Sequence, residues 1–246
     1  MKLKALAAAV ALLAAGNANA LVINNLASTG NSQFLFTAYD DTAAKSYVVG
    51  LNFDMDTLLA NPTGTQTFSL AGLSSFFSGI TTANWSVTAG DQTGTGNFLG
   101  RRILTSANTA ATSFTTTNSG VKNSAIAFDA YVNTTTACTA FTPCTQATSS
   151  DPAYAGQGAW SFNWGNNGPS NIGTLANGSE LAAWLLSTSS QSLAGAATAS
   201  KLAGTWKLNL TANTLTYSAA VPVPAAVWLM GSALTGLVSV GRRRKA

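Results

Sequence analysis

The chain has 246 residues, of which 46% are hydrophobic and only 8% are charged. A core can be buried, but the charged fraction is about a third of that in an average soluble protein. The chain contains no histidine, which excludes Ser-His-Asp and Cys-His catalytic sites and histidine-bound metals. Threonine, serine, asparagine and glycine replace the missing charge, and they favour strands and turns over long helices.

The net charge of +4 comes from the two ends of the chain. Six of the twelve basic residues lie in the tails: Lys2, Lys4, Arg242, Arg243, Arg244 and Lys245. The six basic residues between the tails are outnumbered by the eight acidic residues of the chain. The middle is therefore mildly acidic, and nothing in it predicts binding to nucleic acid.

Residues 1–20 have the three parts of a secretory signal peptide. Lys2 and Lys4 form a basic start, and an apolar run follows from Ala5 to Ala15. Ala18 and Ala20 then offer the small side chains that a signal peptidase accepts. The apolar run is too short to span a bilayer. We expect export by the Sec machinery and cleavage after Ala20.

The segment from Val221 to the end reads as a proline motif, an apolar helix and a basic stop. Ala225 to Gly241 is uncharged, and as a helix it would cover roughly 25 Å of a hydrocarbon core about 30 Å thick. Arg242 to Lys245 follow, and basic segments stay cytoplasmic. Both ends of the precursor should therefore be cytoplasmic and the middle outside. Gly231 and Gly236 leave a face suited to close helix contact within the membrane.

This tail resembles the PEP-CTERM sorting signal of Gram-negative bacteria, in the branch whose motif reads Val-Pro-x-Pro-Ala. Val221, Pro222, Pro224 and Ala225 match that motif, whereas Val223 stands where the name-giving motif has glutamate. The resemblance implies recognition by an exosortase, a multispanning membrane cysteine protease. It also implies later release or transfer to the cell surface or the extracellular polymeric matrix. A plain C-terminal membrane anchor is the alternative.

Residues 21–220 should form one exported β-rich domain. Eight short runs rich in β-branched and aromatic residues predict strands: Gln33 to Tyr39, Lys45 to Phe53, Asn84 to Ala89, Phe98 to Thr105, Ala125 to Val132, Ala159 to Trp164, Thr205 to Leu210 and Thr214 to Ser218. Such a set is typical of an antiparallel β-sandwich or a jelly-roll-like domain. The last two runs, joined through residues 211–213, predict a hairpin.

One short helix is predicted near Glu180, because Leu181, Trp184 and Leu185 lie at helical spacing. The threonine- and serine-rich stretches 108–123 and 134–150 predict exposed loops. Hydroxyl density alone does not identify a glycan acceptor, so we expect solvated loops, with glycosylation as the alternative.

Cys138 and Cys144 are the only cysteines of the chain. An exported chain folds in an oxidising compartment, so we expect one disulfide between them. The bond would close a small loop and contribute about 2 kcal/mol through the entropy of the unfolded chain. With no histidine to complete a ligand set, neither a metal nor any other cofactor is predicted.

The acidic residues form two close pairs, Asp40 with Asp41 and Asp54 with Asp56. Paired carboxylates can serve a glycosidase or bind Ca²⁺. However, Asp40 and Asp41 directly follow a predicted strand, as turn residues do, and the second pair lacks the later glycine and glutamate of an EF-hand loop. We expect structural or solvated acids and no catalytic residue.

Trp160, Phe162 and Trp164 place three aromatic rings on one face of a predicted strand. Such a face packs into a core or stacks on sugar rings. A core face is favoured in a domain so poor in charge, and a platform for extracellular polysaccharide is the alternative.

Together these features predict a non-enzymatic surface or extracellular-matrix protein. An exosortase would sort it from a precursor anchored in the inner membrane. A carbohydrate-binding module and a secreted glycan-active enzyme are the alternatives.

Overall fold

The computed structural model describes residues 27–113, 115–135, 144–146, 150, 153–156 and 173–219 of the chain. The predicted signal peptide, the C-terminal segment and the predicted strand from Ala159 to Trp164 lie outside the described residues. The helices and strands are, in chain order, η1 (Ala27–Thr29), β1 (Gln33–Asp40), β2 (Lys45–Asp54), α2 (Met55–Ala60), β3 (Gln66–Ser69), α3 (Leu73–Phe76), β4 (Asn84–Asp91), β5 (Arg102–Asn108), α4 (Asn118–Thr135), β6 (Cys144–Gln146), β7 (Gly173–Thr174), β8 (Glu180–Ser187), β9 (Thr198–Asn209) and β10 (Thr214–Ala219).

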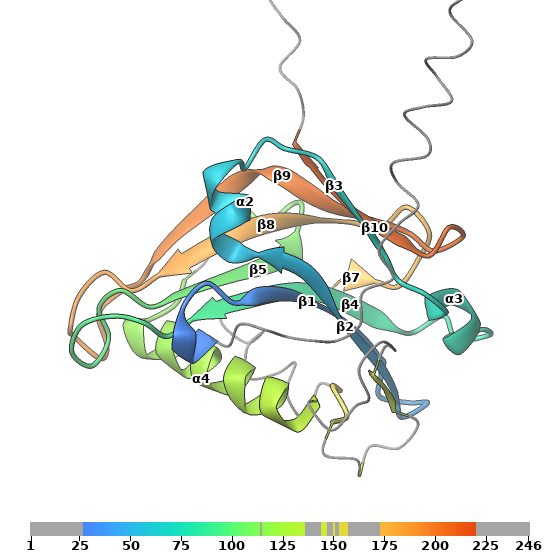
Figure 1. Cartoon of the computed structure of the whole chain (residues 1–246), viewed down its shortest axis with the longest axis horizontal. Helices are drawn as coiled ribbons and strands as arrows, with labels where there is room; N and C mark the ends of the chain where they lie inside the picture. The colour runs from blue at the N-terminus through green and yellow to red at the C-terminus, as the bar shows by residue number, and fades with distance from the viewer. Residues whose placement is uncertain are drawn as a thin grey trace, which may run out of the picture.

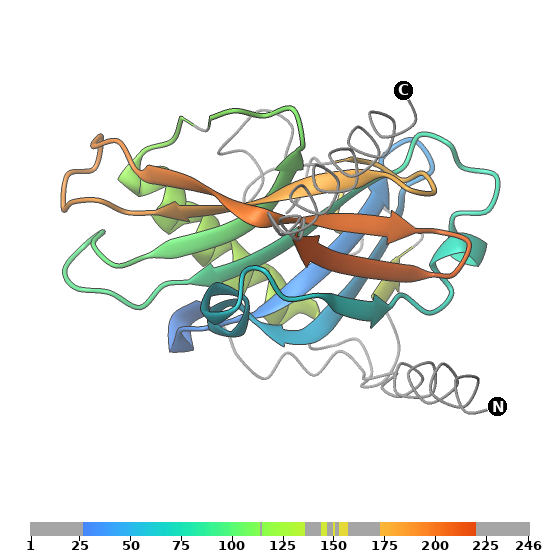
Figure 2. The ribbon, with the colours of Figure 1, turned by 90° about the horizontal axis from the view of Figure 1, so that it is seen from above.

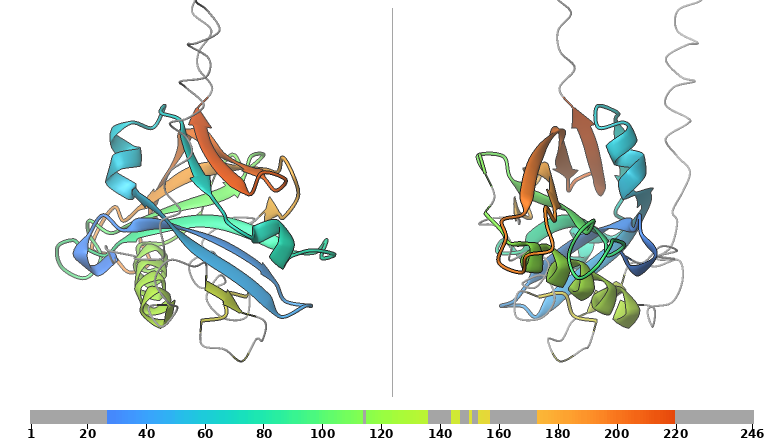
Figure 3. Two further views of the ribbon diagram at one scale, coloured as in Figure 1. Left: turned by 45° about the vertical axis from the view of Figure 1, so that its right-hand side comes forward. Right: turned by 90° about the vertical axis from the view of Figure 1, so that its left-hand side faces the viewer.

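The ten strands belong to a single antiparallel sheet, so the fold is mostly β as predicted. The strand order is β3-β10-β9-β8-β5-β4-β1-β2-β6, and β7 pairs with β4. The sheet twists and curves until it is nearly closed (Figure 1 and Figure 3). A sandwich or jelly roll would have two sheets, whereas here one curved sheet supplies both sides of the core.

The inner core fills the space that the curved sheet encloses. Its largest side chains are completely buried and come from both halves of the sheet: Phe34 and Phe36 of β1, Trp85 of β4, Trp206 of β9 and Tyr217 of β10. In Figure 2, β9 and β10 pass across β1 and β2, which lie beneath them. The ring centroids of Phe34 and Trp206 are therefore only 5.3 Å apart. Met55 and Leu58 of α2 and Leu73 of α3 complete this core.

The outer core lies between the convex face of the sheet and α4, which packs against β4, β5 and β8 (Figure 1). The helix buries its side chains against residues of β5 and β8, among them Ile103, Trp184 and Leu186. The central strands are thus covered on both faces, which explains why their apolar residues form nearly continuous runs.

The predicted strand from Ala125 to Val132 is wrong, because these residues belong to α4. The buried positions of α4 recur every three or four residues, at Val121, Ala125, Phe128 and Val132. This is the period of an amphipathic helix, and the residues upstream of Ala125 continue it. Residues 118–123, predicted as loop, form the first turns of the same helix.

The predicted helix near Glu180 is also wrong, because Glu180–Ser187 form β8. Leu181 and Ala183 point into the inner core, whereas Ala182, Trp184 and Leu186 belong to the outer core. A strand that is buried on both faces has no alternation of polar and apolar residues. Its spacing therefore cannot be distinguished from that of a buried helix.

Most of the other predicted strands are confirmed by β1, β2, β4 and the hairpin of β9 and β10. In the hairpin, Trp206 pairs with Tyr217 and Leu208 with Leu215, as their alternation predicts. The strand predicted from Phe98 begins only at Arg102. α2, β3 and α3 were not predicted, because elements of six residues or fewer carry too little periodicity. β6 was likewise missed, within the loop predicted for residues 134–150.

Candidate functional site

Most of the residues that the sequence analysis singled out lie outside the described residues. These are Ala18, Ala20, Cys138, Trp160, Phe162, Trp164, Val221, Pro222, Pro224, Ala225, Arg242, Arg243, Arg244 and Lys245. Cys144 begins β6, where its main chain pairs with Val48 of β2. The cleavage site, the sorting motif, the disulfide and the aromatic platform therefore stay predictions.

Asp40 and Asp41 lie where β1 ends and the turn to β2 begins. One carboxylate oxygen of Asp40 accepts the N–H of Ala43 at 2.6 Å, and the other accepts the hydroxyl of Thr82. Burial raises the pKa of Asp40, but these hydrogen bonds outweigh it and leave the pKa below its ordinary value. Asp41 accepts a hydrogen bond from the hydroxyl of Tyr154 at 2.9 Å. Burial is the main cause that raises the pKa of Tyr154, and this hydrogen bond raises it further. Both carboxylates thus hold the turn in place.

Asp54 and Asp56 do not act as a pair. Asp54 occupies the N-cap position of α2, without a capping hydrogen bond from its side chain. Asp56 lies in the first turn of α2, and its Oδ1 atom is 3.1 Å from Nη2 of Arg102 in β5. The geometry therefore gives these two acids different surroundings.

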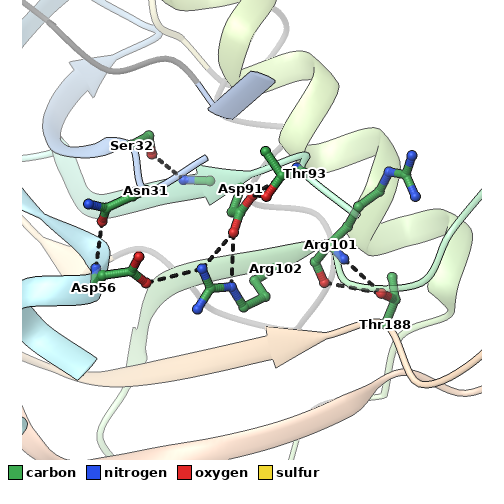
Figure 4. A network of polar contacts seen from close by, with 9 residues as sticks. Asn31, Ser32, Asp56, Asp91, Thr93, Arg101, Arg102 and Thr188 are labelled. Carbon is green, nitrogen blue, oxygen red and sulfur yellow. Dashed lines mark hydrogen bonds and ion pairs between the residues drawn. The ribbon is translucent and has the colours of Figure 1, made fainter. Parts of the chain in front are cut away.

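Arg102 is the centre of a polar network, which we call the Arg102 cluster and which comprises Arg102, Asp91, Asp56 and Thr93 (Figure 4). Nη2 and Nε of Arg102 donate to Oδ2 of Asp91 at 2.5 and 3.1 Å. The other oxygen of Asp91 accepts the N–H and the hydroxyl of Thr93 at 2.7 and 2.5 Å. The side chain of Asp91 is only 4% exposed, whereas that of Asp56 is 51% exposed.

The surroundings of Arg102 favour its charged form. Burial lowers the pKa of Arg102, but the hydrogen bonds and charges of Asp91 and Asp56 outweigh burial and raise it. A charged guanidinium thus balances the deeply buried carboxylate of Asp91.

The segment before β1 continues this network (Figure 4). Oδ1 of Asn31 accepts the N–H of Asp56 at 2.7 Å, and the carbonyl of Ser32 accepts the N–H of Met55 at 3.1 Å. The hydroxyl of Ser32 accepts the N–H of Gly90 at 2.7 Å. The network therefore fixes α2 to β4, to β5 and to the start of β1.

Arg102→Met should destabilise the domain by about 2 to 4 kcal/mol, because it leaves the charge of Asp91 buried without its partner. Asp56→Ala, which breaks only the exposed ion pair of the same arginine, should cost less than about 1 kcal/mol. Urea unfolding followed by circular dichroism measures both values. Equal losses for the two variants would show that the burial of Asp91 is not decisive.

Asp129 of α4 forms a second polar centre, at the first described residues of the chain. Its carboxylate accepts the N–H groups of Ala27 and Ser28 at 2.5 and 2.7 Å. Gln92 donates to the same carboxylate at 3.0 Å and to the carbonyl of Ala125 at 3.0 Å. Asp129 therefore fastens η1 to α4 across a sequence separation of about one hundred residues.

Asp129→Ala should lower the free energy of unfolding by about 2 to 3 kcal/mol. It leaves the buried N–H of Ala27 without its acceptor and removes charge-assisted hydrogen bonds. Asn123→Ala is the matched control, since Asn123 is exposed on the same helix. The control should change stability by less than about 0.5 kcal/mol. A similar small effect of Asp129→Ala in urea unfolding would contradict the role assigned to its carboxylate.

The polar centres of the described residues join separate elements of the fold. Within residues 27–113, 115–135 and 173–219 and the short described segments between them, no three His, Cys, Asp or Glu side chains form a group that could hold a metal. No helix in the same residues has the length and apolar character needed to cross a membrane.

Sequence reasoning missed Arg102, Asp91 and Asp129 as organising residues. A signal was present for the first two, because Arg102 lies within a predicted strand and Asp91 lies just after the preceding one. No local signal existed for Asp129, since its partners lie at the other end of the described chain and its own helix was predicted as a strand.

The comparisons with known proteins do not assign the chain to a family. No family model, no curated protein and no solved structure matches it.

Proposed function

We propose that this chain is an exported, non-enzymatic protein that an exosortase sorts to the cell surface or the extracellular matrix. The observation that carries the proposal is the order of three features at the C-terminus: the Val-Pro-x-Pro-Ala motif from Val221, the uncharged stretch from Ala225 to Gly241, and the basic stop from Arg242. The signal peptide in residues 1–20 supports it, because a sorted protein must first be exported.

The boundary of the folded domain supports the same proposal. β10 ends at Ala219, and only Ala220 separates it from the motif. β10 lies between β9 and β3 in the sheet, and Leu215 and Tyr217 are completely buried. Cleavage within the motif would therefore remove the tail without cutting a strand.

Each part of the tail has a separate physical role in this proposal. Pro222 and Pro224 keep the motif extended and unable to pair regularly, which suits a segment presented to a protease. The apolar stretch holds the motif at the membrane surface. The basic residues keep the end of the chain in the cytoplasm.

Replacing both Pro222 and Pro224 by alanine should leave export and membrane insertion intact but trap the full-length precursor. Without the prolines the motif can continue the helix, and the extended substrate is lost. Val223→Ala is the matched control, because it changes the variable position between the two prolines. Immunoblots of membrane and released fractions, with intact mass of the product, measure the outcome. If the double variant matures to the wild-type mass in cells that contain the exosortase, the plain anchor is the better account.

A further inference from the structure

β2 has an unpaired edge. On one side it pairs with β1, from Lys45 to Asp54. On the other side β6 pairs only with Ser46, Tyr47 and Val48. In the part of the chain that the structure describes, no strand pairs with the edge from Val49 to Asp54.

The pairing of β2 with β1 shifts register between Gln33 and Leu35, and Asn52 has a positive φ of 48°, so the edge is irregular near its end. Before that point it has few of the features that usually protect a sheet edge. From Ser46 to Phe53 the strand contains no charged residue and no proline. Val49 and Leu51 are only 6% exposed, so this edge borders the inner core. A row of N–H and C=O groups beside an apolar core is suited to accept one more strand.

The chain contains a strand-forming segment just before the first described residue. Residues 21–26 read Leu-Val-Ile-Asn-Asn-Leu, and they would become the N-terminal arm of the protein after cleavage at Ala20. Four of these residues are large aliphatic side chains, and two are β-branched. After export, burial of these apolar side chains against protein is favourable, and β-branched residues favour pairing in a sheet.

The position of Ala27 determines which copy can supply this arm. The carbonyl of Ala27 accepts the N–H of Gln92 at 2.7 Å, which fixes the root of the arm at the end of β4. The site beside β2 lies three strand positions from β4, or about 14 Å away. Six extended residues reach about 20 Å, so an arm in its own molecule would have only one or two residues left to pair. An arm from a second copy has no such restriction.

We infer that the N-terminal arm of one copy adds as a strand to the free edge of β2 in the next copy. The donor surface and the acceptor surface differ, so each copy can give one arm and receive another. Two copies that exchange arms with each other form a closed dimer, whereas copies that pass the arm onward form chains. The inference rests on export and on cleavage after Ala20, but not on the route by which the tail is removed. It supplies a means of assembly outside the cell.

Disulfide trapping between copies tests this contact. Processed protein carrying Asn25→Cys is mixed with processed protein carrying Asn52→Cys, an exposed position on the edge of β2. After oxidation we expect a heterodimer between the two variants. Asn209→Cys replaces Asn52→Cys in the control mixture, because Asn209 is exposed at the end of β9, far along the sheet. Ile23→Pro in the arm should abolish the heterodimer, and Ile23→Val should keep it.

Three outcomes would overturn the inference. The first is equal trapping by Asn52→Cys and Asn209→Cys, or trapping by neither. The second is a disulfide within one chain when Asn25→Cys and Asn52→Cys are combined, which would assign the edge to the molecule's own arm. The third is sedimentation of the unmodified processed protein as a monomer at its highest soluble concentration. Because the purified protein is already processed, these outcomes are independent of the exosortase test.

Discussion

Trp206→Ala should lower the free energy of unfolding by about 3 to 5 kcal/mol, the largest loss expected from a single substitution in the domain. Trp206 is completely buried in the inner core. Its ring centroid lies 5.3 Å from that of Phe34, 6.2 Å from Phe68 and 4.9 Å from Tyr217. Alanine would leave a cavity between strands from opposite halves of the sheet, where neither half can move inward without breaking its own pairing.

Urea unfolding followed by circular dichroism measures this loss, and two variants make it interpretable. Leu193→Ala is the control, because Leu193 is 62% exposed and should contribute less than about 0.5 kcal/mol. Trp206→Phe should cost much less than Trp206→Ala. It keeps an aromatic ring and removes an indole N–H that has no hydrogen-bond partner among the described residues. A loss below about 1 kcal/mol for Trp206→Ala would contradict the assignment of this ring to a closely packed core.

Replacing Arg242, Arg243, Arg244 and Lys245 by glutamine should allow the C-terminal end of most precursor molecules to cross the membrane. Moving one of these charges to the centre of a bilayer costs about 2.5 to 3.5 kcal/mol, so the basic stop strongly opposes translocation of the end of the chain. Without it, uncleaved precursor should appear in the released fraction or with its end exposed to external protease. Lys245→Arg keeps the charge and should behave as the wild type. Correct orientation and processing of the glutamine variant would show that the apolar stretch alone holds the tail.

The sequence predicted the strands that have clear turns or a clear alternation of residues. β1 and β2 are separated by a short turn, and the hairpin of β9 and β10 alternates between buried and exposed residues, so local pattern determined both. The pattern failed where burial depends on distant segments. β8 is apolar on both faces because the inner core lies on one side and α4 on the other. α4 itself was predicted as a strand because its β-branched and aromatic residues from Ala125 to Val132 favour strands, although its buried positions follow a helical period.

The polar contacts also differ in how far they could be predicted from the sequence. The ion pair of Asp91 and Arg102 joins directly paired residues of two adjacent strands, so a hairpin prediction with the correct register would have found it. The contacts of Asp129 with Ala27 and Ser28 join segments about one hundred residues apart. No spacing rule predicts such a contact, because it depends on how η1 packs against α4 and β4.

Intact mass of the protein recovered from the surface or matrix of its own cells tests the central claim most directly. The proposal predicts a chain that begins at Leu21 and ends at or near the motif of Val221 to Ala225. Both the signal peptide and the basic stop would then be absent from the measured mass. Recovery of the mature protein with Arg242 to Lys245 still attached would contradict processing by an exosortase and would favour a permanent membrane anchor.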